Sequence, residues 1–239
     1  FPLLAGKSGQ NIRLTVRHAD GTTTTEKVKP VSNGANRLLL YERWKDRNRH
    51  IVDSISGGKV GYVHITGMDS PSFREIYSDV MGKYRDCDAI VIDTRFNGGG
   101  WLHNDVAQLF SGRKTADFAP QGHYIGSDPI NQFTKPSAML VSECNYSDAY
   151  GTPYTYKTLN VGKLVGAPVA GTMTAVWWET QVNPNIIFGI PQVTCLDLNG
   201  KPLENQQLNP DLLIYNQPAD ILNGKDSQLE GAVRLLMGN

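Results

Sequence analysis

The chain has 239 residues, a formal net charge of zero and 40% hydrophobic residues, which is typical of a soluble globular protein with one large core, or with a core and a smaller fragment. No apolar run approaches the roughly 20 residues that cross a bilayer, and the balanced charge favours neither nucleic acid nor an anionic membrane as a partner. The three cysteines, Cys87, Cys144 and Cys195, lie too far apart for a metal site or a disulfide framework, so we expect them to be small buried apolar residues.

The N-terminal part of the chain predicts a β-hairpin followed by a helix. Residues 11–29 alternate between apolar and polar residues around the turn Asp20-Gly21. Residues 30–36 are rich in Pro, Gly, Ser and Asn, as in a linker. The apolar spacing from Leu38 to Ile55 then favours a helix that ends at Gly57-Gly58. Because the first residue is Phe1 and no signal-like segment precedes it, we expect that the natural N-terminus has been removed.

Strands and helices alternate along the rest of the chain, which favours a layered α/β core. The continuous apolar run Ala89–Ile92 predicts a strand that is covered on both faces. A helix over residues 70–84 is expected to take Ser70 as its N-cap, before Pro71. The other expected strands span residues 59–65, 138–141, 163–166 and 186–193, and the other expected helices span 105–110, 149–159 and 226–237.

A polar segment between an expected strand and an expected helix places Ser147 at a corner of the chain. A helix that opens after this corner would aim unpaired N–H groups and a positive dipole at an anion that forms beside the serine. Pro153 fits the first turn of that helix, where a missing N–H costs little. The alternative is that Ser147 and Asp148 only cap the helix, since Ser and Asp are preferred there.

A second chemical signal is the run of three glycines, Gly98-Gly99-Gly100, after the buried strand. Glycines allow backbone conformations closed to other residues and let the main chain approach a ligand closely. A tight turn between strand and helix would also explain them. The segment lacks both G-x-G-x-x-G and the Lys-Ser/Thr ending of a phosphate loop, which argues against nucleotide binding.

Together these segments resemble the tricorn-type peptidases, within the wider family of C-terminal processing peptidases. The resemblance covers nearly the whole chain and runs in the same order. It is carried by residues 59–65, 93–100, 145–148 and 166–172 and by Glu204-Asn205-(x4)-Pro210-Asp211. It implies an α/β fold with a layered core of the crotonase and Clp-protease kind. It also implies that residues 1–30 are the C-terminal fragment of a PDZ-like domain and that residues 31–239 form the peptidase core.

The resemblance also implies roles for individual residues. Ser147 would be the nucleophile that forms an acyl-enzyme, and Glu204 would orient a histidine base. The main-chain N–H of Asp148 would form the oxyanion hole with a glycine, Gly99 before Gly98. Gly100 and one of Trp177 and Trp178 would contact substrate, while the other tryptophan would pack inward, because neighbours on a strand point to opposite faces.

The base itself is the part that the sequence lacks. No lysine occurs between Lys163 and Lys201, which argues against a Ser/Lys dyad. In tricorn-like chains the catalytic histidine lies upstream of the PDZ domain, so we expect it outside this chain and expect the chain alone to be nearly inert. His103 and His123 could line the cleft. However, no motif identifies the general base among the five histidines, which are His18, His50, His64, His103 and His123.

The sequence therefore predicts a serine peptidase that cleaves peptides or unfolded proteins, with no metal and no organic cofactor. The competing hypothesis is a peptide-binding or scaffolding protein that has kept the fold and lost catalysis. No nucleic acid or membrane span is expected. Related peptidases often assemble, so a homo-oligomer is an open alternative, and the way such peptidases are deployed suggests a periplasmic or otherwise extracytoplasmic location.

Overall fold

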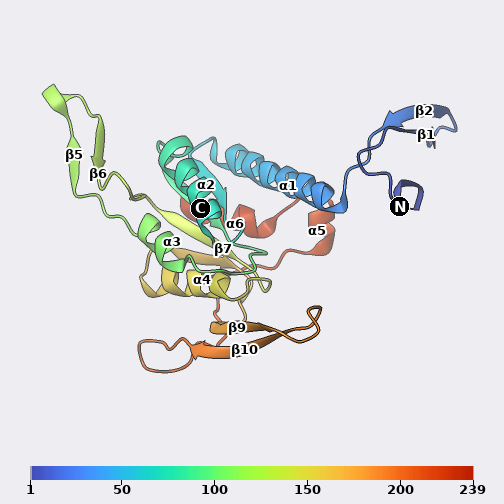
Figure 1. Cartoon of the computed structure of the whole chain (residues 1–239). Coiled ribbons are helices and arrows are strands. Elements are labelled where there is room, and N and C mark those ends of the chain that lie inside the picture. The colour runs from blue at the N-terminus through green and yellow to red at the C-terminus, as the bar shows by residue number, and fades with distance from the viewer. Residues whose placement is uncertain (1, 239) are drawn as a thin grey trace. The chain divides into compact units, whose positions relative to one another are not determined.

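A computed structural model describes residues 2–238 and divides into two units between Arg47 and Asn48 (Figure 1). The first unit contains a short 3₁₀ helix, η1 (Pro2–Leu4), and an antiparallel hairpin of β1 (Ile12–Arg17) and β2 (Thr23–Val28). The predicted hairpin is therefore confirmed.

Helix α1 (Asn33–Ser56) begins in the first unit and continues into the second. The prediction of a linker up to residue 36 is wrong at its end, because the hydroxyl of Ser32 accepts a hydrogen bond from the N–H of Ala35 at 3.1 Å. This is the bond of an N-cap residue, and it starts the helix at Asn33.

The second unit is built on a five-stranded parallel sheet in the order β11-β8-β7-β4-β3. These strands are β3 (Val60–His64), β4 (Ala89–Asp93), β7 (Ser137–Val141), β8 (Lys163–Gly166) and β11 (Leu212–Leu213). Between these strands come α2 (Ser70–Ser78), the π-helical turn η2 (Asp79–Lys83), α3 (His103–Phe110) and α4 (Asp148–Thr158), and after the last strand come α5 (Pro218–Leu222) and α6 (Ser227–Met237). The predicted α/β class is confirmed.

Both faces of this sheet are covered, and strand β4 shows how. Ile90 and Ile92 point into a core shared with α2, η2, α3 and α4. Ala89 and Val91 point into a second core on the other face, where Val52 of α1 and three buried residues of α6 pack. All five residues of β4 are buried, as its continuous apolar sequence predicts.

The start of α2 differs from the prediction by one residue. Asp69 is the N-cap, because its carboxylate accepts a hydrogen bond from the N–H of Ser72, and Ser70 is the first helical residue. This bond and the one from the Ser72 side chain lower the pKa of Asp69. Within residues 2–238, no helix combines the length and the apolar character that a bilayer span requires.

Two antiparallel hairpins were not predicted as such. One pairs β5 (Ala116–Phe118) with β6 (Gly126–Asp128), with the 3₁₀ turn η3 (Pro120–Gly122) between them. The other pairs β9 (Thr174–Thr180) with β10 (Ile187–Thr194), with a bulge between Pro191 and Val193. Figure 1 shows β9 and β10 as a two-stranded ribbon that leaves the layered core below α4.

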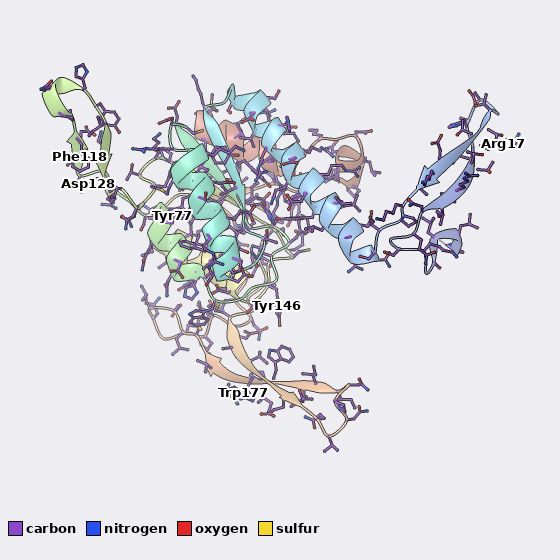
Figure 2. All side chains as sticks on the ribbon, turned by 45° about the horizontal axis from the view of Figure 1, so that its top comes forward. Arg17, Tyr77, Phe118, Asp128, Tyr146 and Trp177 are labelled. Atoms are coloured by element: carbon purple, nitrogen blue, oxygen red, sulfur yellow. The ribbon has the colours of Figure 1, made fainter. Side chains whose placement is uncertain are left out.

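The tryptophans of β9 correct a prediction. Trp177 and Trp178 are both exposed, with 57% and 67% of the residue surface accessible, so neither packs inward. The reason is that β9 has a single partner strand, so neither face of the ribbon is covered by a helix layer. Figure 2 shows Trp177 on this ribbon, clear of the core. The cysteines are also more accessible than predicted, since Cys144 is exposed and Cys87 and Cys195 are half-buried.

Candidate active site

Ser147 lies at the corner between β7 and α4 in a backbone conformation that few non-glycine residues adopt. Its φ of 56° and ψ of −126° place it outside the regions that L-residues prefer, at a cost of about 1–3 kcal/mol. Ser147 occupies the N-cap position of α4, yet its side chain makes no capping hydrogen bond. The capping alternative is therefore wrong for this residue, and its hydroxyl is available for chemistry.

Asn145 holds the corner in place, partly by bonding a carbonyl oxygen that Pro153 leaves without a donor. Pro153 lies in the second turn of α4 instead of the predicted first turn, and without an N–H it cannot bond the carbonyl oxygen of Ala149. The side-chain amide of Asn145 donates to that oxygen at 3.0 Å and to the hydroxyl of Thr94 at 2.9 Å. The buried asparagine thus satisfies an acceptor inside α4 and ties the helix start to the end of β4.

The glycine loop lies directly against Ser147. A Cβ atom added to Gly99 would come within 2.6 Å of the Ser147 Cβ and 3.1 Å of the Asp148 nitrogen, and the φ of Gly99 is +97°. The N–H of Gly99 donates to the side-chain oxygen of Asn97 at 2.8 Å, whereas the N–H groups of Gly98 and Asp148 have no acceptor among residues 2–238. Two unpaired main-chain donors therefore flank the serine.

A cavity of about 360 Å³ opens beside Ser147. Its wall contains Gly98 and Gly100 from the glycine loop, and Trp178 from β9 also lines it. Trp177 does not line this cavity, and its indole N–H donates to the carboxylate of Glu179 at 2.5 Å. The remaining lining residues are Trp101, Tyr146, Ser147, Asp148, Thr172, Met173, Thr174, Ala175, Val176 and Cys195. The wall is mostly apolar and aromatic, and Asp148 is its one charged residue.

Glu204 is connected to the cavity through the segment that leads into β9. Its carboxylate accepts a hydrogen bond from the N–H of Thr174 at 2.9 Å. Two residues earlier, the hydroxyl of Thr172 accepts the N–H of Ser147, also at 2.9 Å. Gly171 packs closely against the main chain of Gln206, two residues after Glu204, because an added Cβ at Gly171 would collide with it. One short segment therefore bonds both Ser147 and Glu204, the two residues to which the family resemblance gives catalytic roles.

None of the histidines within residues 2–238 lines this cavity. His18 bonds Thr24 in the first unit, and His64 bonds the carbonyl oxygen of Arg95 inside the second. His103 follows the glycine loop as the first residue of α3, and its Nδ1 lies 2.5 Å from the carboxylate of Asp148. No hydrogen bond joins the Ser147 hydroxyl to an imidazole in the part of the chain that the structure describes.

The side chain of Asp148 is the feature that sequence reasoning missed. It is 1% exposed and belongs to α4, yet it bonds the start of α3 instead of capping its own helix. The pKa of His103 is raised mainly by the hydrogen bond between its imidazole and the Asp148 carboxylate. The negative charges of Asp148 and Asp105 raise it further, and burial lowers it. A sequence carries no local signal for the pair, because 45 positions separate the two residues.

Other buried charges near the site are structural. Arg95 follows the end of β4, and its buried guanidinium bonds Asp93 at 2.7 Å and Asp226, the N-cap of α6, at 2.9 Å. Burial raises the pKa of Asp93, but the charge and hydrogen bonds of Arg95 outweigh it and lower the pKa overall. No group of three His, Cys, Asp or Glu side chains within residues 2–238 is arranged to hold a metal ion.

Comparisons with known proteins show which family and which fold the chain matches. A model of peptidase family S41 matches residues 59–214. The tricorn protease of Thermoplasma volcanium is 22% identical over the whole chain, and a tricorn protease homolog of Saccharolobus solfataricus is 28% identical over 94% of it. The chain spans 23% and 21% of these relatives, or about a fifth of their length.

Solved structures show the same fold. The crystal structure of the tricorn protease matches all of the chain with a TM-score of 0.84 at 23% identity, and the match covers 23% of that protein. Mature CPAF in complex with lactacystin matches 97% of the chain with a TM-score of 0.59 at 15% identity, over 69% of its own length.

Proposed function

The chain belongs to peptidase family S41, and from that premise we propose that it is the catalytic core of a serine peptidase that cleaves peptide bonds through Ser147. The observation that carries the proposal is the conformation of Ser147. Its backbone is strained, its hydroxyl caps no helix, and it faces a cavity with unpaired main-chain N–H groups. Strain that surrounding contacts maintain at one residue is typical of a functional site.

The oxyanion hole in this proposal consists of main-chain donors. The N–H of Asp148, at the start of α4, is one of them, and the helix dipole adds to its effect. The second donor is the N–H of Gly98, which is unpaired, or the N–H of Gly99. The Gly99 N–H could donate to an oxyanion only after its hydrogen bond to the side-chain oxygen of Asn97 has broken. Gly100 lines the same cavity, where it would contact the substrate main chain.

The general base in this proposal is a histidine from a part of the protein upstream of residue 1. Glu204 would accept a hydrogen bond from one ring nitrogen of that histidine and stabilise its charged form. Support comes from the hydrogen bonds of Thr172 and Thr174, which hold the serine and the glutamate to one segment. The cavity leaves Ser147 accessible to such a group.

The reaction then proceeds as acyl transfer. The histidine takes the proton of the Ser147 hydroxyl while the oxygen attacks the peptide carbonyl carbon, and the main-chain donors stabilise the resulting oxyanion. The protonated imidazole returns the proton to the leaving amine, and the C–N bond breaks. Water, activated by the same histidine, hydrolyses the acyl-serine and releases the carboxylic acid. No step requires a metal or an organic cofactor.

The substrates in this proposal are peptides or unfolded segments, since a cleft must accept an extended main chain. Met173, Val176 and Trp178 give the cavity wall an apolar surface, which favours an apolar side chain next to the scissile bond. Trp178 would contact that side chain, and Trp177 would contact substrate only beyond the cavity.

Replacement of Ser147 by Ala in the active peptidase tests the proposal. We expect complete loss of peptide hydrolysis and of covalent labelling by a fluorophosphonate, with peptide binding retained. A variant that still turns over peptide would refute the role of Ser147. A wild-type protein that binds peptides but neither hydrolyses them nor reacts with the fluorophosphonate would favour the alternative function, an inactive peptide-binding scaffold.

A further inference from the structure

The carboxylate of Asp148 makes an unusual connection between two helices. Asp148 lies in the first turn of α4, where an acidic side chain normally interacts with the N-terminus of its own helix. Instead, one carboxylate oxygen accepts the N–H groups of Leu102 at 2.5 Å and His103 at 3.1 Å. These are the N-cap and first residues of α3, whose own N-cap side chain makes no capping bond. Asp148 therefore caps the neighbouring helix.

The imidazole of His103 completes the connection from the other side. Its Nδ1 lies 2.5 Å from the second carboxylate oxygen of Asp148. Because a carboxylate only accepts hydrogen bonds, Nδ1 must carry the proton. The imidazole also packs against the Trp101 ring in a T-shaped arrangement, with ring centroids 5.2 Å apart. His103 is 14% exposed at its side chain, so water competes little for the bond.

The position of this pair relative to the serine gives it a consequence for catalysis. The main-chain N–H of Asp148 is one donor beside Ser147, and the glycine that would supply the other precedes Leu102 in the same loop. The side-chain bonds of Asp148 thus join the two chain segments that carry the two donors. They add to a main-chain bond that also joins these segments, from the N–H of Tyr146 to the carbonyl oxygen of Asn97 at 3.1 Å, and the glycines themselves have no side chains that could strengthen the link.

We propose that Asp148 and His103 form a positioning pair that holds the two main-chain donors at the separation an oxyanion requires. The inference rests on the proposed function. The side chains of the pair act through the main chain and touch neither substrate nor the Ser147 hydroxyl, and they raise turnover by keeping the oxyanion hole assembled before substrate arrives. His103 is therefore not the general base, which agrees with its absence from the cavity wall.

Two substitutions at His103 separate this role from others. His103→Asn keeps an N–H donor near the Nδ1 position, whereas His103→Phe keeps the ring volume and removes the donor. In the active peptidase we expect His103→Phe to lower kcat roughly tenfold or more with little change in KM, and His103→Asn to stay within about threefold of wild type. The same ratio is expected for the rate of fluorophosphonate labelling per folded molecule.

Stability is measured in parallel, since a merely structural pair would change only the fraction of folded protein. Each variant is assayed well below its own unfolding midpoint. Unchanged kcat in His103→Phe under these conditions would overturn the inference while leaving the proposed function intact. Loss of kcat by about 10³-fold in both variants would identify His103 as the base instead and also overturn it. An inactive wild type would overturn the proposed function and this inference together.

A measurement on the wild-type protein covers the case in which a variant does not fold. The pKa of His103, followed by the NMR signal of its imidazole, should lie above the usual value of about 6.5, because Asp148 bonds it and the charges of Asp148 and Asp105 favour its protonated form. With five histidines in the chain, the signal can be assigned. An ordinary or lowered pKa would show that the pair does not form in solution and would overturn the inference.

Discussion

Replacement of Gly99 by Ala tests the close approach of the glycine loop to the serine corner. The new Cβ atom would lie 2.6 Å from the Cβ of Ser147, 2.7 Å from the carbonyl oxygen of Tyr146 and 3.1 Å from the nitrogen of Asp148. These atoms belong to the main chain or lie next to it, so no flexible side chain can move aside. Gly99 also has a φ of +97°, which an alanine adopts only with strain.

The expected cost has two parts. A left-handed conformation costs an alanine about 1–2 kcal/mol, and overpacking a tight site costs about 1–3 kcal/mol more. We therefore expect Gly99→Ala to lower the free energy of unfolding by about 2–5 kcal/mol. The folded fraction should also lose fluorophosphonate labelling of Ser147, because relief of the clash must move the serine or the loop.

Two matched variants separate the two parts of that cost. Gly200→Ala has a φ of +80° with nothing within 4 Å of the new Cβ, so it should show the strain alone, about 1–2 kcal/mol. Gly98→Ala has open space and no positive φ, so its free energy of unfolding should change by less than about 1 kcal/mol. Urea unfolding monitored by tryptophan fluorescence measures all three. If Gly99→Ala cost no more than Gly200→Ala, the loop would not contact the serine corner as the structure shows.

Three further predictions concern the charges and bonds around the site. Arg95→Met should lower the free energy of unfolding by about 3–5 kcal/mol at neutral pH, because it leaves Asp93 buried and unpaired. In the wild type the pKa of Asp93 is lowered, so its stabilising contribution is present above its unfolded pKa of about 3.9 and is lost as the pH falls through the folded value. The variant should instead gain stability on acidification. Urea unfolding between pH 3 and pH 7 measures both effects. Thr172→Val removes the acceptor for the Ser147 N–H and should lower kcat about tenfold, whereas Thr172→Ser should not; equal rates for Val and Ser would argue against the bond. Glu204→Gln keeps an oxygen for the main-chain N–H it binds but loses the charge, so kcat should fall on the order of 10²-fold or more with the unfolding midpoint unchanged, and a change in the midpoint alone would contradict its catalytic role.

The parts of the fold that the sequence predicts are those governed by local periodicity and by burial. The run Ala89–Ile92 is apolar at every position because a helix layer covers each face of the sheet. Gly57-Gly58 ends α1 as expected, since both glycines have a positive φ. In contrast, the prediction that one of Trp177 and Trp178 packs inward is wrong, because a sequence cannot show that β9 has only one neighbouring strand.

The site divides in the same way between local and distant contacts. The strand, corner and helix around Ser147 follow from a contiguous stretch of residues, as does the glycine loop. The roles of Asp148 and Thr172 depend on bonds that span 45 and 25 positions, and no spacing rule reaches that far. The assignment of Glu204 and of a base outside the chain came from resemblance to a family, and both stay predictions.

Asn145 shows why such distant bonds belong to the same design as the local motif. A proline in the second turn of α4 would ordinarily destabilise the helix, since it leaves the carbonyl oxygen of Ala149 without a donor. Asn145 supplies that donor from the strand side of the corner, and its own oxygen accepts bonds from Ser142. The proline and the asparagine together fix the angle at which α4 leaves the corner. The strain at Ser147 can therefore persist, because bonds on both sides of the residue hold its backbone in a conformation that it would not adopt alone.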